Sequence, residues 1–235
     1  MFCAIPFPGN IWDEDARHKM LLFLPVVGLE IGLIWAAAAF LTIMMGIPQL
    51  LRGAILCVLP FALTGFIHFD GFMDVTDAVK SCRDLEKRRK ILKDPHVGSF
   101  AVIGCVLLLL FQFSVTASLE RGFGLLVLLP AVSRCCSALA VTILRPMSTS
   151  QYATGERKRS AVWILSVQLV VYLLLGWLFF GSGVLALGIS MAGSIISIAK
   201  GFRSLDGMNG DISGYAITLG ELWGLIGLLI VGGML

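Results

Sequence analysis

Three aspartates that stand close together are the strongest chemical feature of the sequence. Asp70, Asp74 and Asp77 lie in the run His68-Phe-Asp-Gly-Phe-Met-Asp-Val-Thr-Asp77, at the end of an apolar stretch. Their spacing of four and three residues puts the carboxylates on one side of a helix. Each would cost roughly 2.5–3.5 kcal/mol at the centre of a membrane helix, so three without a matched Lys or Arg imply a cation nearby. We predict Mg²⁺, which carboxylates hold while leaving positions for phosphate; the alternative is a solvated helix end.

A glycine-rich segment, Leu205-Asp-Gly-Met-Asn-Gly-Asp211, is the second candidate. Backbone N–H groups in such a loop bind phosphate oxygens, which Arg203 would also contact, and Asp211 would add a metal ligand. Glycine-rich turns are common in loops without any such function. The segment gains weight because the basic residues place it on the same side of the membrane as the aspartates.

The segment Lys93-Asp-Pro-His-Val-Gly98 allows two explanations. Its proline and glycine would end a short helix and turn the chain into the next apolar stretch. Alternatively, Asp94 would bind the metal and Lys93 a phosphate. The basic residues that precede this segment are typical of a lipid-facing surface, and they would also attract anionic nucleotides.

The elements that must position these residues are membrane helices. The chain has 235 residues, of which 57% are hydrophobic and 14% charged, whereas a soluble domain carries about a quarter charged residues. Seven apolar stretches approach the length that crosses a hydrocarbon core of ~30 Å. They cover about residues 21–45, 51–69, 98–118, 124–144, 162–180, 183–199 and 219–235. We predict an all-α polytopic membrane protein, with about seven transmembrane helices in one bundle and residues 1–235 as a single domain.

The basic residues indicate the orientation of the chain. With a cytoplasmic N-terminus, 15 of the 18 Lys and Arg residues fall on inside segments, and only Arg52 and Arg121 fall on outside loops. Segments 70–98 and 200–218 then face the cytoplasm. The net charge of +3 therefore reflects the membrane topology and does not indicate a nucleic-acid partner. Six cysteines without a CxxC pair predict free thiols, not a disulfide framework or a zinc site.

Three charged residues inside the apolar stretches need partners, because ionisable groups within a membrane seldom face lipid. They are Glu30, Arg134 and Glu221. Arg134 would either pair with a carboxylate or bind a phosphate, and the sequence does not choose between the two. Glu221 lies early in the last stretch, and Glu30 has no assigned role.

Four blocks of the sequence together resemble the cobalamin synthase family, the adenosylcobinamide-GDP ribazoletransferases. They run from Gly65 to Asp77, from Leu92 to Gly98, from Val132 to Arg134, and from Gly207 to Gly214 with Leu219-Gly-Glu221 following. The first block is similar to the family's GG-x-H-x-DG-x-x-D-x-x-D pattern, and the likeness covers nearly the whole chain. Four residues depart from the family: Thr64, Ala78 and Asp206 replace usual glycines, and Asn209 replaces a usual threonine.

The resemblance implies a reaction on a diphosphate. A hydroxyl of α-ribazole, or of α-ribazole 5′-phosphate, would join the cobinamide phosphoryl group of adenosylcobinamide-GDP, and GMP would leave. The product, adenosylcobalamin or its 5′-phosphate, completes the nucleotide loop of vitamin B12. Such an enzyme would lie in the cytoplasmic (inner) membrane of a prokaryote with its active site toward the cytoplasm. A homo-oligomer, or a complex with other cobalamin-assembly enzymes, stays open.

Residue roles follow from the resemblance together with the needs of phosphoryl transfer, which depends on charge neutralisation more than on covalent chemistry. The implied Mg²⁺ ligands are Asp70, Asp74, Asp77, Asp94 and Asp211. One carboxylate of the first three, or His68, would orient or deprotonate the attacking hydroxyl. The substrate-binding candidates are Lys93, Arg134, Arg203 and Asn209.

Two other functions share parts of this pattern. A membrane phosphotransferase of the CDP-alcohol type would use the same metal chemistry, but Asp70-Gly is not followed by the Ala-Arg pair of that type. A cation or proton transporter would place charges near the membrane midplane and carry internal symmetry. Only Glu30 and Arg134 favour a transporter.

Overall fold

The computed structural model describes residues 14–147 and 159–232, with side chains from residue 20 onward. Within these ranges the chain forms nine α-helices and no β-strand apart from an isolated bridge between Pro146 and Met208. The helices are α1 (Glu14–Met44), α2 (Gln49–Leu63), α3 (Ile67–Lys80), α4 (Leu85–Ile91), α5 (Ser99–Ser118), α6 (Leu129–Ile143), α7 (Arg159–Phe180), α8 (Val184–Leu205) and α9 (Gly210–Val231). Short 3₁₀ helices, Phe123–Val127 and Gly181–Gly183, precede α6 and α8. The prediction of an all-α protein is confirmed.

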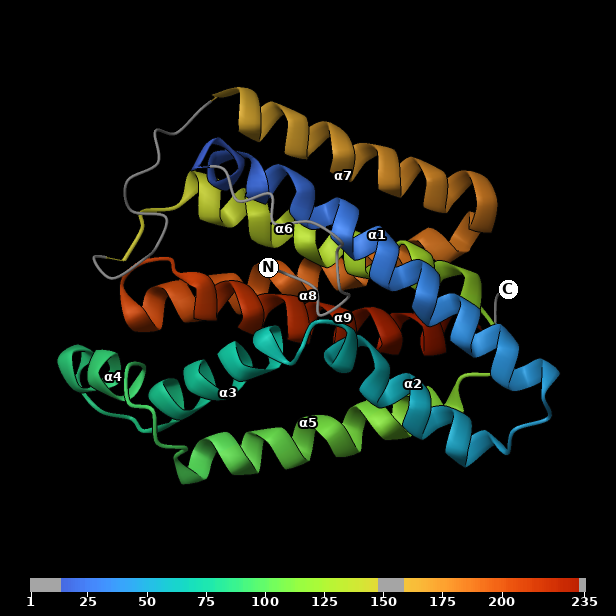
Figure 1. The fold of residues 1–235 in the computed structure, drawn as a ribbon, viewed down its shortest axis with the longest axis horizontal. Coiled ribbons are helices and arrows are strands. Elements are labelled where there is room, and N and C mark those ends of the chain that lie inside the picture. The colour runs from blue at the N-terminus through green and yellow to red at the C-terminus, as the bar shows by residue number, and fades with distance from the viewer. Residues whose placement is uncertain (1–13, 148–158, 233–235) are drawn as a thin grey trace.

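Among the described residues, five segments are long and apolar enough to cross a membrane, or six if the bent pair α2–α3 counts as one span. One of the five, Arg159–Leu205, is 47 residues long. A straight helix of that length would measure about 70 Å, more than twice the hydrocarbon core. Figure 1 shows the chain reversing direction between α7 and α8, where Gly181–Gly183 interrupts the segment. A polytopic helical membrane protein is confirmed, and the number of seven spans stays a prediction.

The span predicted over 51–69 is not one continuous helix, because the chain bends by 92° between α2 and α3. Gly65 and Phe66 both adopt positive φ, 60° and 62°. This left-handed conformation interrupts a right-handed helix. The Thr64 hydroxyl donates to a carbonyl in the last turn of α2 over 2.9 Å, which occupies one of the acceptors that the helix end leaves free. His68 therefore lies in the first turn of α3 and not at the end of a straight span.

The expected loop over 200–218 is wrong in its extent. α8 continues to Leu205 and α9 begins at Gly210, so the connection is a tight turn. Asp206, with φ +53°, ends α8. Asn209 begins α9, because its Oδ1 accepts a backbone N–H of the first turn at 3.0 Å. The last apolar helix therefore starts at residue 210 instead of residue 219.

Helix α9 is the centre of the bundle (Figure 1), where it packs along α8 and crosses α3 and α6. Hydrophobic clusters lie along this centre, one containing Leu129 and Leu228 and another containing Val75 and Tyr215. The short helix expected before Pro95 and Gly98 is confirmed as α4, whose Ile91 packs against the second cluster. The position of α9 is what allows residues from several helices to meet near its N-terminus.

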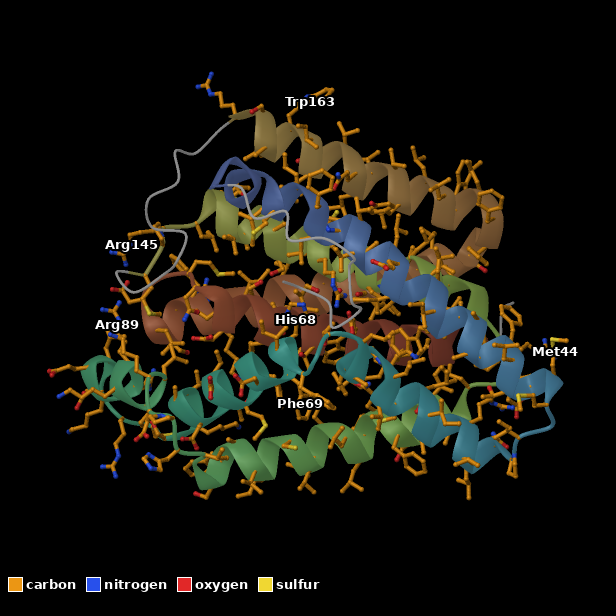
Figure 2. All side chains as sticks on the ribbon, viewed as in Figure 1. Met44, His68, Phe69, Arg89, Arg145 and Trp163 are labelled. Carbon is orange, nitrogen blue, oxygen red and sulfur yellow. The ribbon has the colours of Figure 1, made fainter. Side chains whose placement is uncertain are left out.

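The predicted inside segments gather at one end of the bundle. Arg89 of α4 and Arg145 after α6 both bind Asp206, between α8 and α9. Figure 2 shows these arginines at the end opposite to Met44. At that other end, the side-chain amide of Gln49 donates to a carbonyl of α5 over 2.7 Å. Four residues used for the orientation have side chains outside the described part: Arg17, Lys19, Arg157 and Lys158. The side of the membrane that each end faces stays a prediction.

We expect the end that carries Arg89 and Arg145 to face the cytoplasm. In a background without native thiols, a membrane-impermeant maleimide added to intact cells should modify Arg121→Cys and spare Lys93→Cys. Both side chains are exposed, so burial does not explain a difference. Permeabilised cells should show labelling of both variants. Labelling of Lys93→Cys alone in intact cells would reverse the orientation.

Candidate functional site

One face of α3 carries the three aspartates. Asp70 is exposed, Asp74 and Asp77 are partly buried, and the single helix predicted from their spacing is confirmed. Apolar residues such as Val75 turn another face of α3 into the bundle. The charges of Asp70, Asp77 and Asp211 all act on the Asp74 carboxylate. The structure thus brings four of the five predicted metal ligands together, and we call Asp70, Asp74, Asp77 and Asp211 the acidic face.

Asp211 reaches the acidic face because the backbones of α3 and α9 approach each other closely. A Cβ atom on Gly71 would lie 2.8 Å from the Asp211 carbonyl oxygen. A Cβ atom on Gly214 would lie 2.8 Å from the His68 carbonyl oxygen. Side chains cannot occupy such positions without moving a backbone, so the crossing needs glycine on both helices. The glycine after Asp70 in the first sequence block is explained by this contact.

Asn209 holds Asp211 in place. Its side-chain amide donates to Asp211 Oδ2 at 2.6 Å, while its carbonyl oxygen caps α9. The side chain is buried, and both of its polar ends are in use. In the structure Asn209 supports Asp211 and caps α9, and its contact with substrate stays a prediction.

Asp77 has a second environment at the beginning of α5. Its Oδ1 accepts the backbone N–H of Ala101 at 3.3 Å. Its carboxylate also lies where a Cβ atom on Gly98 would be. A carboxylate at a helix N-terminus is stabilised by the helix dipole. Oδ1 of Asp77 is committed to α5, and Oδ2 accepts no hydrogen bond from the described residues.

The acidic face fits a hard cation by its chemistry, although its carboxylates do not form a closed shell. Within the described residues, no three Asp, Glu, His or Cys side chains are close enough to hold an ion as they stand. No Lys or Arg in the described part of the chain forms an ion pair with these four aspartates. Unpaired carboxylates repel one another. Because Mg²⁺ takes one or two carboxylates and fills its other positions with water and phosphate, the arrangement suits a metal that arrives with a diphosphate.

The structure gives Asp94 a different partner. Its Oδ1 accepts the backbone N–H of His96 at 3.0 Å and lies 2.7 Å from the ring nitrogen Nδ1. The hydrogen bond from the His96 backbone lowers the pKa of the Asp94 carboxyl. This local turn accounts for Asp94 without a metal. Its predicted place among the metal ligands is not reproduced, and Lys93 beside it is an exposed cation.

His68 is buried where α3 crosses α9. The Thr218 hydroxyl donates to the His68 carbonyl oxygen at 3.2 Å, and the ring nitrogen Nε2 has no hydrogen-bond partner among the described residues. The side chain is only 8% exposed, and the charge of Arg134 acts on it. Figure 2 places His68 midway along the bundle, away from the arginines at its end. A substrate hydroxyl would reach the exposed Asp70 more readily than this ring.

Arg134 forms a buried ion pair with Glu221. Its guanidinium donates to Glu221 Oε1 at 2.5 Å and to the Pro130 carbonyl oxygen at 3.1 Å. The Ser133 hydroxyl donates to the same carboxylate oxygen at 3.4 Å. Of the two alternatives for Arg134, pairing with a carboxylate is the one found. Its place among the substrate-binding residues has no support from the structure.

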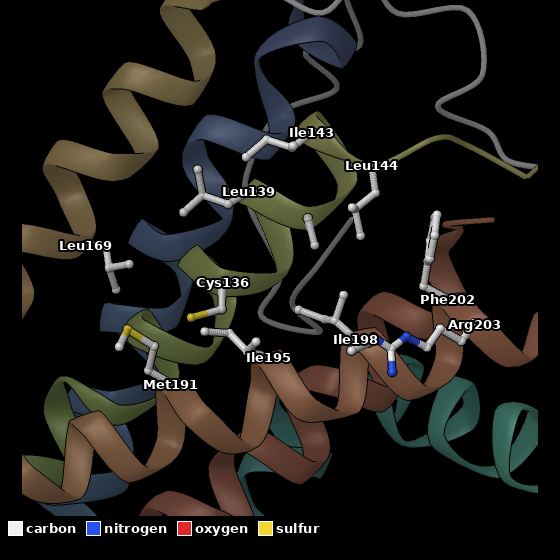
Figure 3. Close-up of a pocket in the computed structure, with 12 residues that line it drawn as sticks. Cys136, Leu139, Ile143, Leu144, Leu169, Met191, Ile195, Ile198, Phe202 and Arg203 are labelled. Carbon is white, nitrogen blue, oxygen red and sulfur yellow. The ribbon is translucent and has the colours of Figure 1, made fainter. Parts of the chain in front are cut away.

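Arg203 lies on α8, where it faces α6 and not α3. It lines a cavity with Leu144 and Ile198 (Figure 3), and none of the described lining residues belongs to α3 or α9. The structure therefore does not bring Arg203 to the acidic face, as the sequence had led us to expect. The helix α8 continues through this residue because the turn starts only at Asp206.

Comparison with known proteins identifies the family. The sequence model of the family described as cobalamin-5-phosphate synthase matches residues 1–229. The chain belongs to this family. An adenosylcobinamide-GDP ribazoletransferase of Clostridium perfringens (strain SM101) is 34% identical over 98% of this chain and 95% of its own length. Relatives with the same name from Clostridium botulinum (strain Alaska E43) and Lachnoclostridium phytofermentans are 32% and 28% identical, over 96% and 100% of this chain and 92% of each relative. No solved structure matches the chain.

Asp206 holds one end of the site together in this member of the cobalamin-5-phosphate synthase family. Its carboxylate binds Arg145 and lies 3.4 Å from the Arg89 guanidinium, which also donates to the Leu205 carbonyl at 3.0 Å. The backbone N–H of Met208 donates to the Arg145 carbonyl at 2.9 Å. The turn that leads to Asp211 is thereby tied to α4 and to the segment after α6. Sequence reasoning missed this contact, although an acidic residue in place of a usual glycine was its signal.

We expect Glu221→Gln to destabilise the protein, because Arg134 would keep a buried charge without a counterion. Loss of one partner of a buried pair costs about 3–5 kcal/mol in the free energy of unfolding. Denaturant unfolding in detergent measures the effect. Glu86→Gln, which removes the exposed partner of Lys90, is the matched control and should change little.

A double variant, Arg134→Met with Glu221→Gln, tests the reason for that loss. It should regain much of the stability, because no unpaired charge remains. If Glu221→Gln and Glu86→Gln unfolded alike, the buried pair would have no structural role.

Proposed function

We propose that this chain joins adenosylcobinamide-GDP to α-ribazole or α-ribazole 5′-phosphate. The product is adenosylcobalamin or its 5′-phosphate, and GMP is released. The observation that carries this proposal is similarity along the full chain: relatives named adenosylcobinamide-GDP ribazoletransferase align over 96–98% of it at about a third identity. The CDP-alcohol and transporter alternatives lack such support. The acidic face adds the chemistry that a diphosphate substrate requires.

The reaction moves one phosphoryl group between oxygens. The α-ribazole hydroxyl oxygen forms a bond to the phosphorus that is attached to cobinamide. The bond from that phosphorus to the GMP oxygen breaks, GMP carries away the electron pair, and the hydroxyl proton passes to a base. Since no oxidation or reduction occurs, the protein has to position the groups and to balance the charge.

We assign the metal-binding role first to Asp70, Asp74 and Asp211, with one oxygen of Asp77 in support. Bound Mg²⁺ would offset the negative charge of the diphosphate and of the departing GMP. Four carboxylates without paired Lys or Arg among the described residues are a donor set of the right chemistry for it. Asp94 is not assigned to this set, because its carboxylate accepts the backbone N–H of His96.

We assign the proton acceptor to the acidic face as well. Asp70 is exposed and Asp74 partly buried, so either carboxylate is accessible to the substrate hydroxyl. His68, at 8% exposure behind the α3–α9 crossing, would instead support the position of the two helices. Lys93 remains the exposed cation that would attract the guanine nucleotide.

We place the acidic face on the cytoplasmic side of the cytoplasmic (inner) membrane of a prokaryote. The support is the bias of basic residues toward the same end of the bundle. Nucleotide substrates made in the cytoplasm would then reach the site without crossing the bilayer. A homo-oligomer or a complex with other cobalamin-assembly enzymes is compatible with this placement.

We expect purified protein in detergent to release GMP from adenosylcobinamide-GDP only when α-ribazole or its 5′-phosphate is also present. Removal of Mg²⁺ by a chelator should stop the release, and added Mg²⁺ should restore it. Chromatography of the corrinoid products identifies the new phosphodiester. GMP release that needs no second substrate would mean hydrolysis and would contradict the transferase.

We expect Asp74→Asn to lower turnover by orders of magnitude. The substitution keeps the size of the side chain but removes a charge, and metal assistance is worth several kcal/mol, with each ~1.36 kcal/mol a factor of ten. Stability without Mg²⁺ should hold or rise, because repulsion on the acidic face decreases. Initial rates across a Mg²⁺ titration, together with unfolding curves, measure both effects.

Asp84→Asn is the matched control for this measurement. Asp84 caps α4 through a hydrogen bond from the Lys87 N–H at 3.0 Å, and Asn caps a helix about equally well. Activity and stability should therefore change little. Normal turnover of Asp74→Asn at limiting Mg²⁺, or equal loss in both variants, would remove Asp74 from the metal site.

A further inference from the structure

A cavity of about 440 Å³ lies between α6 and α8, with Leu169 of α7 beside it (Figure 3). Apart from Arg203, its lining consists of Leu, Ile, Ala, Phe and Met side chains and the Cys136 thiol. Such a lining offers almost no hydrogen bonds. It is therefore suited to a hydrocarbon chain and not to a polar nucleotide.

The cavity is a groove in the outer surface of the bundle. Ile143 and Ile195, which line it, are 49% and 53% exposed. Both belong to helices that are long and apolar enough to cross a membrane. The solvent at this surface is therefore lipid, and acyl chains are the molecules that reach the groove.

Arg203 supplies a charge at one end of the groove. It lies in the last turn of α8, and Figure 3 shows its guanidinium near Ile198 at the rim of the lining. No carboxylate in the described part of the chain pairs with it, whereas Arg89 and Arg145 share Asp206. A guanidinium that borders hydrocarbon needs an anionic partner at the membrane interface.

We propose that the groove between α6 and α8 binds an anionic phospholipid, with an acyl chain along the apolar lining and the headgroup phosphate on Arg203. Charge complementarity at one end and hydrocarbon along the rest match the two parts of such a lipid. The site is separate from the acidic face, because its described lining residues come from α6, α7 and α8.

The bound lipid would also act on the acidic face through α8. Phe202 and Arg203 line the groove, and α8 ends two residues later at the Asp206 turn. That turn leads directly to Asn209, which orients Asp211. This step rests on the metal role proposed for Asp211: a lipid that holds the end of α8 would steady that residue without touching substrate.

Native mass spectrometry of the purified full chain in detergent tests the proposal, with phosphatidylglycerol and phosphatidylcholine as separate probes. The wild type should retain phosphatidylglycerol in preference to phosphatidylcholine. Arg203→Ala should weaken phosphatidylglycerol retention roughly tenfold, as expected for loss of a charge-assisted hydrogen bond. Ala199→Phe, which fills the groove, should reduce retention of both lipids.

Arg159→Ala is the matched control, since Arg159 is an exposed arginine at the beginning of α7 and does not line the groove. It should leave retention unchanged. Unchanged phosphatidylglycerol retention in Arg203→Ala or in Ala199→Phe overturns the proposal, as does an equal loss in Arg159→Ala. A raised KM for α-ribazole in Arg203→Ala with intact lipid retention would assign the groove to substrate instead. Lipid retention is measured without turnover, so it stands apart from the test of the transferase reaction.

Discussion

The close crossing of α3 and α9 is the contact on which the candidate site depends. Gly71 and Gly214 let two backbones meet where any other residue would hold them apart. The backbone of Asp211, in the first turn of α9, thereby lies against Gly71, the residue that follows Asp70 in α3. A wider crossing would leave the three aspartates of α3 without Asp211, so the candidate site requires glycine at both positions.

Two groups of charges in the described part of the chain have different consequences. Arg134 with Glu221, and Asp206 with Arg89 and Arg145, are paired, and they fix helices relative to one another. The aspartates of the acidic face are not paired with cations there. Folding favours paired charges, and unpaired carboxylates raise the free energy of the folded chain. Their presence side by side is therefore better explained by a ligand that brings positive charge than by stability.

Local patterns in the sequence predict some of these features and not others. The spacing of Asp70, Asp74 and Asp77 suffices to put them on one helix face, because helical periodicity is a local property. The break before α3 depends on left-handed conformations at Gly65 and Phe66, and hydrophobicity does not report backbone angles. The early start of α9 depends on a cap by Asn209. The pairing of Arg134 with Glu221 and the position of Arg203 at the groove depend on helix packing, which brings together residues far apart in the sequence and leaves no local pattern.

The positions of the arginines limit which cations are able to neutralise the negative charge of the diphosphate. Arg134 is held by Glu221 inside the bundle, and Arg203 faces the groove between α6 and α8. Arg89 and Arg145 are held by Asp206. Neither Lys93 nor Arg203 pairs with a carboxylate among the described residues, but Arg203 lies at the groove, so the exposed Lys93 is the expected cation left for the diphosphate. One flexible ammonium group does not offset the charge of a diphosphate and a leaving nucleotide, which is the physical reason for proposing a metal ion on the acidic face.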